Sequence, residues 1–219
     1  MPSRKVKEKS AAESTSENAQ SGSGTQVGTR YSAEEIHENL LNEADEEMER
    51  PAEGLALSGL ASGLGIGFSF LAVALLTSRM APENHALAAA IAYPLGFVFV
   101  VLARHQLFTE NTLEPVIPFL ERRDRETFRK LLRLWAIVLP ANLIGAVIFA
   151  LVIARTRALD PSLSGTLLNV AREATEGGAG MVFYKAIWAG WLVALMAWML
   201  ASTRDTTAQI ILVWLTTAP

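Results

Sequence analysis

The sequence has 219 residues, of which 51% are hydrophobic and 19% charged, with no cysteine and a formal net charge of −3. The lack of cysteine excludes disulfide bonds and thiolate chemistry in this chain. The net charge says little about partners, because the acidic excess lies mostly in the N-terminal segment. Almost all apolar residues follow Gly54 in long blocks, which predicts an all-α integral membrane protein behind a polar N-terminal extension.

The polar N-terminal extension divides into two parts. Residues 1–30 hold too few apolar side chains to offset the entropy of ordering, so we expect a disordered tail, and no signal-peptide core is visible there. Residues 31–50 are predicted to form an amphipathic cytoplasmic helix. Ser32 and Glu35 have the spacing of a capping box, and apolar residues recur at helical spacing among many acids. We expect this helix to pack on the membrane domain, residues 51–219, or on a neighbouring subunit.

Four apolar stretches are long enough to cross a hydrocarbon core of about 30 Å, namely residues 55–77, 86–103, 134–154 and 181–202. Gly59 and Gly63 in the first stretch have the small-xxx-small spacing that allows close helix packing. Residues 206–219 form only a partial fifth span, because at a rise of about 1.5 Å per residue they are too short to cross the hydrocarbon core. We therefore expect the sequence to stop within the membrane.

Positive charges set the expected orientation. Residues 121–133 contain six arginine or lysine residues, whereas the first predicted loop holds only Arg79. By the positive-inside rule, the second loop and the N-terminus are cytoplasmic. Residues 155–180 are then an external loop.

The second apolar stretch ends in a polar break at a depth where lipid is expected. Polar and helix-breaking residues follow the half-helix that begins near Ile91, and apolar residues resume beyond them; the break contains Arg104, His105, Gln106, Thr109, Glu110 and Asn111. Lipid tails cannot satisfy such groups, so they must face protein or a water-filled cavity. Broken helices of this kind line ion paths in transporters. The pattern predicts a membrane channel or transporter rather than an enzyme, with no cofactor, no metal site and no nucleic-acid partner.

The ionisable residues of the break allow more than one interpretation. His105 is either a pH sensor in the path or a brace for the loop together with Glu110. Arg104 either attracts anions or pairs with Glu110, since buried charges are usually paired.

Three motifs resemble the formate/nitrite transporter family of bacterial anion channels. They are the sequence of Leu107, Phe108 and Thr109 followed by Asn111, the run NLIGA at residues 142–146, and the run GWLVALMAW at residues 190–198. The resemblance extends from about Glu34 to the end of the sequence.

The resemblance implies a homopentamer in the bacterial inner membrane, in which each six-helix protomer is an aquaporin-like inverted repeat with its own path. It implies transport of small monovalent weak-acid anions such as formate or nitrite, linked to protonation near a central histidine. Thr109 matches the threonine of the family's first broken helix, and we place Leu107, Phe108 and Asn111 beside it on the path. Tyr93 and Phe97 match the family's constriction, with ordinary helix packing as an equal alternative.

Departures from the family pattern leave other functions open. The region of the central histidine and the sixth helix do not occur in the sequence, and Gly190 stands where the family often has asparagine. One alternative is a non-conducting membrane scaffold of the same fold. Another is a facilitator of neutral solutes.

Overall fold

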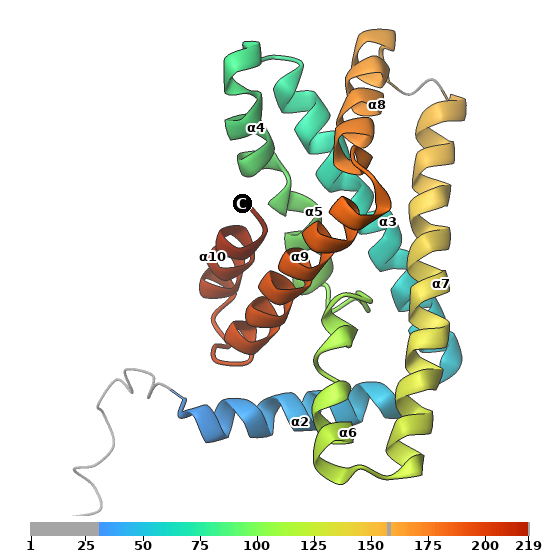
Figure 1. The fold of residues 1–219 in the computed structure, drawn as a ribbon, viewed down its shortest axis with the longest axis vertical. Coiled ribbons are helices and arrows are strands. Elements are labelled where there is room, and N and C mark those ends of the chain that lie inside the picture. The colour runs from blue at the N-terminus through green and yellow to red at the C-terminus, as the bar shows by residue number, and fades with distance from the viewer. Residues whose placement is uncertain (1–30, 157–158, 219) are drawn as a thin grey trace, which may run out of the picture. The chain divides into compact units, whose positions relative to one another are not determined.

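The computed structural model describes residues 31–156 and 159–218, in which every regular element is a helix (Figure 1). The predicted disordered tail, residues 1–30, lies outside the described residues. The described residues form one unit.

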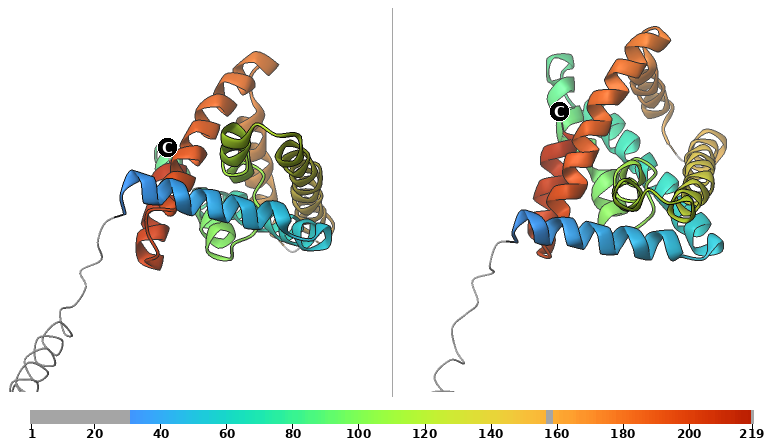
Figure 2. Two further views of the ribbon diagram at one scale, coloured as in Figure 1. Left: turned by 90° about the horizontal axis from the view of Figure 1, so that it is seen from below. Right: turned by 60° about the horizontal axis from the view of Figure 1, so that its bottom comes forward.

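Helix α2 spans Ala33–Glu49 and begins at the predicted capping box. The Ser32 amide donates to Glu35 Oε2 at 2.6 Å, and the Glu35 amide donates to Ser32 Oγ at 3.2 Å. Leu40, Ala44 and Met48 form its buried stripe. The helix lies across one end of the bundle, beside α6 and the start of α7 (Figures 1 and 2). We call this the α2 end.

Helices α3 (Ala52–Thr77) and α7 (Arg125–Thr156) pack closely, with their backbones in contact at Gly63 and Gly145. A Cβ atom on Gly63 would collide with the Asn142 carbonyl oxygen, and one on Gly145 would collide with the Leu60 carbonyl oxygen. The close approach predicted from Gly59 and Gly63 is therefore confirmed. Met48, Leu55, Leu134 and Val138 form a buried cluster that extends this packing to α2.

The second span is divided into α4 (His85–Ala92) and α5 (Pro94–Leu102), preceded by a 3₁₀ turn at Pro82–Asn84. Sequence patterns predict one uninterrupted helix here. Proline has no amide hydrogen, so the hydrogen-bond ladder is interrupted at Pro94. The Gly96 amide, in the first turn of α5, donates to Ser69 Oγ of α3 at 3.1 Å. A neighbouring helix thus satisfies one of the amides at the start of α5.

The remaining elements are one 3₁₀ turn and four helices. They are η2 (Glu110–Thr112), α6 (Val116–Arg122), α8 (Pro161–Thr175), α9 (Ala179–Leu200) and α10 (Thr206–Thr217). Two predicted loops prove to be largely helical. Most of residues 121–133 extend α6 and α7, and α8 occupies much of residues 155–180. Asp160 followed by Pro161 at the first helical position is a typical helix start, which accounts for α8.

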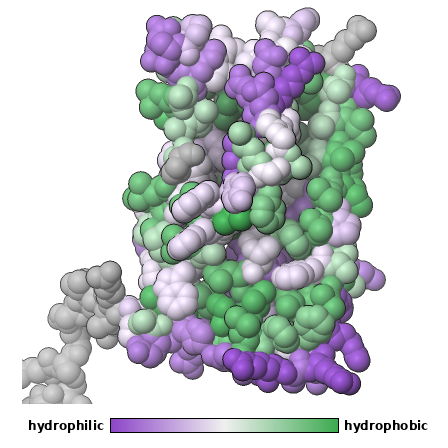
Figure 3. Space-filling view, viewed as in Figure 1, coloured by the Kyte–Doolittle hydropathy of each residue, from purple (hydrophilic) through white to green (hydrophobic). Residues whose placement is uncertain are grey.

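Four helical segments are long and apolar enough to cross a membrane: Ala52–Thr77, Pro82–Leu102, Arg125–Thr156 and Ala179–Leu200. They overlap the four predicted spans. Figure 3 shows hydrophobic side chains over the middle of the visible face and hydrophilic ones gathered at its two ends. These features identify an all-α, multi-pass membrane protein whose second span is broken.

Candidate functional site

The polar break begins where α5 ends. Arg104 adopts a left-handed conformation with φ of 52°. The His105 amide donates to the Val100 carbonyl at 3.0 Å and the Arg104 amide donates to the Val101 carbonyl at 3.0 Å. This pair of bonds is a Schellman motif, which usually has glycine at the left-handed position. The motif turns the chain sharply out of the helix, and arginine there costs about 1–2 kcal/mol.

Gln106 is the central residue of the loop that follows. Its side chain is only 2% exposed, and all of its hydrogen-bonding groups are engaged. The backbone amide donates to Ser58 Oγ of α3 at 3.0 Å, and side-chain Nε2 donates to Glu47 Oε1 of α2 at 2.7 Å. Side-chain Oε1 accepts from Asn111 Nδ2 at 2.8 Å. Gln106 therefore ties the loop to two helices and to itself.

Asn142 of α7 holds the other side of the loop. Its Oδ1 accepts from the Phe108 amide at 2.9 Å. Its Nδ2 donates to the Gln106 carbonyl at 2.9 Å and to the Gly59 carbonyl of α3 at 2.8 Å. One side chain thus satisfies two backbone groups of the loop that lipid could not satisfy.

Asn111 closes the loop on its far side. It is 1% exposed, and its carbonyl accepts from the indole Nε1 of Trp135 at 2.8 Å. The ring of Phe108 packs edge-on against the same indole, with centroids 6.1 Å apart. Trp135 of α7 therefore fixes both the apolar and the polar part of the loop.

The three predicted path residues before Asn111 have different surroundings. Leu107 is buried and Phe108 half-buried, whereas Thr109 is exposed. The Thr109 carbonyl accepts from Thr112 Oγ1 at 2.6 Å. Its own hydroxyl makes no hydrogen bond within the described part of the chain. Thr109 is thus the residue of this set that presents a polar group outward.

The loop charges are arranged differently from the predicted pairing. Arg104 Nη2 donates to Glu43 Oε1 of α2 at 3.1 Å and does not pair with Glu110. Among the described residues, no hydrogen bond joins His105 to Glu110 either. Glu110 itself begins η2 and is half-buried. Of the alternatives left open for Arg104, pairing with Glu110 is therefore not the arrangement found, because α2 lies beside the loop and supplies Glu43 as its partner.

Tyr93 and Phe97 do lie together, one turn apart, with ring centroids separated by 5.5 Å. Tyr93 lies at the junction of α4 and α5, and its ring also packs against that of Phe70, with centroids 6.1 Å apart. Phe97 packs against a buried cluster of Val98, Val193, Met196 and Val213 that joins α5, α9 and α10. Both rings therefore take part in helix packing, whichever role they have on a path.

Helix α2 is attached to the rest of this end by ion pairs as well as by Gln106. Arg122 makes a two-pronged contact with Asp45, with Nη1 and Oδ1 2.7 Å apart. His37 Nε2 lies 2.6 Å from Glu121 Oε1. These pairs are exposed, so each contributes little alone. Together with the buried contacts they fix α2 beneath the loop.

Glu47 is a half-buried acid in this attachment. Desolvation by burial raises the pKa of Glu47, although its hydrogen bond from Gln106 opposes the shift. A raised pKa means that the folded protein binds the proton more tightly than the unfolded chain. The free energy of unfolding of the protein should therefore fall as pH rises above the usual pKa of a glutamate side chain.

Glu47→Gln tests this dependence, because the amide keeps the acceptor for Gln106 and removes the charge. We expect the variant to raise the apparent melting temperature by about 2–4 °C at about pH 8, and to change it little at about pH 5. Thermal unfolding in detergent at both pH values measures the difference. Glu46→Gln, at an exposed neighbouring position, is the matched control. An equal gain in both variants, or no gain at high pH, would contradict the interpretation.

Several of these residues lie outside the set predicted to line the path: Gln106, Asn142, Ser58, Trp135 and Glu47. Asn142 carries the clearest signal, since it is an amide inside an apolar span. Within residues 31–156 and 159–218, no group of three or more histidine or acidic residues is arranged to hold a metal ion. The site is therefore a polar loop held by hydrogen bonds, with an exposed hydroxyl at Thr109.

A family model described as formate/nitrite transporter matches residues 34–218. The chain belongs to this family. The match covers every described helix from α2 to α10. Membership confirms the family expected from the three motifs.

Named relatives agree with this assignment. The chain is 31% identical to inner membrane protein YfdC of Escherichia coli, over 82% of this chain and 59% of that protein. It is 28% identical to a probable formate transporter of Methanothermobacter thermautotrophicus, over 73% of this chain and 65% of the relative. It is 26% identical to nitrite transporter NirC of Salmonella typhimurium, over 74% and 59% respectively. The chain thus spans about three-fifths of the length of these proteins.

Solved structures of the family share the fold. An FNT family ion channel aligns with a TM-score of 0.71 and 21% identity, over 85% of this chain and 75% of that one. A pentameric formate channel with formate bound aligns with a TM-score of 0.65 and 22% identity, over 76% and 67%. At this level of identity the likeness concerns the fold alone, and it confirms the family's membrane-helix architecture for this chain.

Proposed function

We propose that this protein transports small monovalent weak-acid anions, such as formate or nitrite, along a path that passes Thr109. The proposal rests on family membership together with the geometry of the broken second span. The observation that carries it is the contrast between a loop whose backbone is held by Gln106 and Asn142 and a threonine hydroxyl that makes no bond of its own within the described residues. A fixed loop with a free hydroxyl is suited to contact a passing anion.

The chemistry follows from the cost of moving charge through an apolar barrier. A permanently charged ion pays that cost in full, whereas a weak acid avoids it by taking up a proton. The hydroxyl of Thr109 can donate to a carboxylate and accept from its protonated form. Leu107 and Phe108 beside it supply the apolar walls. Transport linked to a proton is the expected consequence.

Assembly and orientation belong to the same proposal. The chain forms a homopentamer in a bacterial inner membrane, with the α2 end on the cytoplasmic side. The basic residues near the start of α7 favour this orientation by the positive-inside rule. The inner-membrane name of the Escherichia coli relative and the pentameric state of a formate channel of the same fold support the location and the assembly.

Thr109→Val is expected to slow anion uptake about five- to tenfold, because it removes one hydrogen bond and keeps the side-chain shape. Initial rates of formate and nitrite uptake into proteoliposomes measure the effect, with the protein purified from its native membrane. Thr156→Val is the matched control, since that exposed hydroxyl donates only to its own helix, at Val152.

Unchanged uptake in Thr109→Val would remove this residue from the path. Uptake of other solutes into the same vesicles distinguishes between the alternative functions. Glycerol uptake without anion uptake would favour a neutral-solute facilitator. No uptake of any solute by correctly assembled protein would favour a non-conducting scaffold.

A further inference from the structure

The basic side chains between Arg122 and Arg133 fall into two sets. The first set is engaged within the chain. Arg122 pairs with Asp45, Lys130 lies 3.5 Å from Glu49, and Arg133 donates to the Arg50 carbonyl at 3.0 Å. These contacts fasten α2 to α6 and α7, and carboxylates partly neutralise the charges of Arg122 and Lys130.

The second set consists of Arg123, Arg125 and Arg129, all exposed. Arg123 donates to the Leu120 carbonyl at 3.1 Å. None of the three has a carboxylate partner among the described residues. The nearby acids are already occupied: Asp124 accepts from the amide and hydroxyl of Thr127, and Glu126 lies 3.3 Å from Lys130. The three guanidinium groups are therefore available to an external anion.

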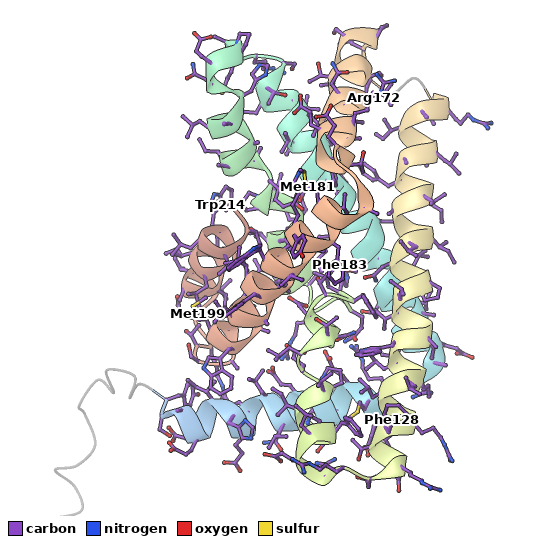
Figure 4. The ribbon with its side chains drawn as sticks, viewed as in Figure 1. Phe128, Arg172, Met181, Phe183, Met199 and Trp214 are labelled. Carbon is purple, nitrogen blue, oxygen red and sulfur yellow. The ribbon has the colours of Figure 1, made fainter. Side chains whose placement is uncertain are left out.

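The arginines head a stripe that continues into the membrane span. Arg125 and Arg129 lie one turn apart on α7, and Leu132, Leu139 and Leu143 follow at helical spacing with exposed fractions of 45%, 39% and 59%. The side chain of Phe128, 44% exposed, sits beside the stripe at the α2 end (Figure 4). The stripe is thus cationic at its end and apolar along its length.

We propose that this face of α7 binds anionic phospholipid, with the head group at Arg123, Arg125 and Arg129 and an acyl chain along the leucines. The order of charge and apolar surface matches the order of a phospholipid from its phosphate to its tail. Guanidinium groups bind phosphate oxygens in a two-pronged geometry, and basic groups at a membrane surface attract anionic lipid. An apolar stripe alone would suit any lipid, so it is the arginines without a carboxylate partner that select an anionic one.

The test measures lipid selectivity in bilayers of mixed phosphatidylglycerol and phosphatidylcholine. Spin-labelled analogues of each lipid report the fraction held at the protein surface. Arg123→Gln, Arg125→Gln and Arg129→Gln are combined in one variant. The matched control combines Arg79→Gln, Arg155→Gln and Arg172→Gln, which are exposed positions outside the α2 end; Figure 4 places Arg172 at the opposite end.

We expect the wild-type protein and the control to favour phosphatidylglycerol about fivefold or more, and the α2-end variant to lose most of that preference. Replacing the same three arginines with lysine should retain it, which separates lost charge from lost folding. High salt should weaken it, because the groups are exposed.

A wild-type protein without preference would overturn the proposal, as would an α2-end glutamine variant that keeps the full preference. Equal loss in the control would also overturn it, since the effect would then be one of overall charge. Because the sequence has no cysteine, Arg129→Cys offers a single reactive site. Efficient cross-linking between copies through that site would assign the face to a second subunit instead.

Discussion

Asn142→Leu is expected to abolish anion uptake while the protein still reaches the membrane. Leucine is similar in size but cannot bond to the Phe108 amide or to the Gln106 and Gly59 carbonyls. Each buried backbone group left unsatisfied costs about 1–3 kcal/mol, so the loop, with two such groups, should lose about 2 kcal/mol or more. The loop before Thr109 would then leave its fixed position. Uptake by proteoliposomes and the oligomeric state of the purified variant measure the two parts of this expectation.

Asn169→Leu is the matched control, because Asn169 is exposed on α8 and makes no side-chain hydrogen bond within the described residues. Asn142→Asp adds a second comparison, since it keeps the acceptor for Phe108 and loses both donors. We expect its uptake to lie between that of the wild type and that of Asn142→Leu. Normal uptake by Asn142→Leu would contradict the role of this side chain in positioning the loop.

Gly63→Ala should destabilise the whole bundle. A methyl group at this position meets the Asn142 carbonyl oxygen and comes within 3.0 Å of the Ala146 amide, and both are backbone atoms that cannot turn away. Helices α3 and α7 must separate to admit it, and overpacking of this kind typically costs about 1–3 kcal/mol. The separation would also displace Asn142 from the loop. We expect a lower yield of assembled protein, a lower apparent melting temperature and reduced uptake.

Gly190→Ala on α9 provides the contrast within an apolar helix. Nothing lies within 4 Å of a Cβ atom placed there. Alanine is a better helix former than glycine by about 1 kcal/mol, so this variant should be as stable as the wild type or more stable. Thermal unfolding of both variants under the same conditions measures the difference. Equal stability of the two would show that α3 and α7 tolerate separation.

The membrane spans could be predicted from the sequence because an uncharged apolar run of about 20 residues is typical of a helix that crosses a bilayer. The broken second span could be located for the same reason, since polar residues interrupt such a run. The division at Pro94 and the helical nature of residues 161–175 are absent from the sequence-based expectations. Both depend on local rules at a proline, one that ends a hydrogen-bond ladder and one that begins a helix, and hydropathy alone does not reveal them.

The partners of the loop could not be predicted in the same way. Gln106 bonds to Glu47 and to Ser58, and Phe108 bonds to Asn142, across long stretches of sequence. Such pairings depend on how helices cross, which no local pattern encodes. One alternative for Arg104, pairing with Glu110, fails for this reason. Glu110 is near it in the sequence, but Glu43 is brought near it by α2.

Uptake of formate by proteoliposomes, measured as an initial rate at several external pH values, tests the central claim most directly. The protein should be purified from its native membrane and compared with protein-free vesicles of the same lipid. We predict uptake well above that of the protein-free vesicles, rising as external pH falls because the transported anion takes up a proton. Uptake equal to that of protein-free vesicles at every pH, by folded and assembled protein, would contradict the assignment of this chain as an anion transporter.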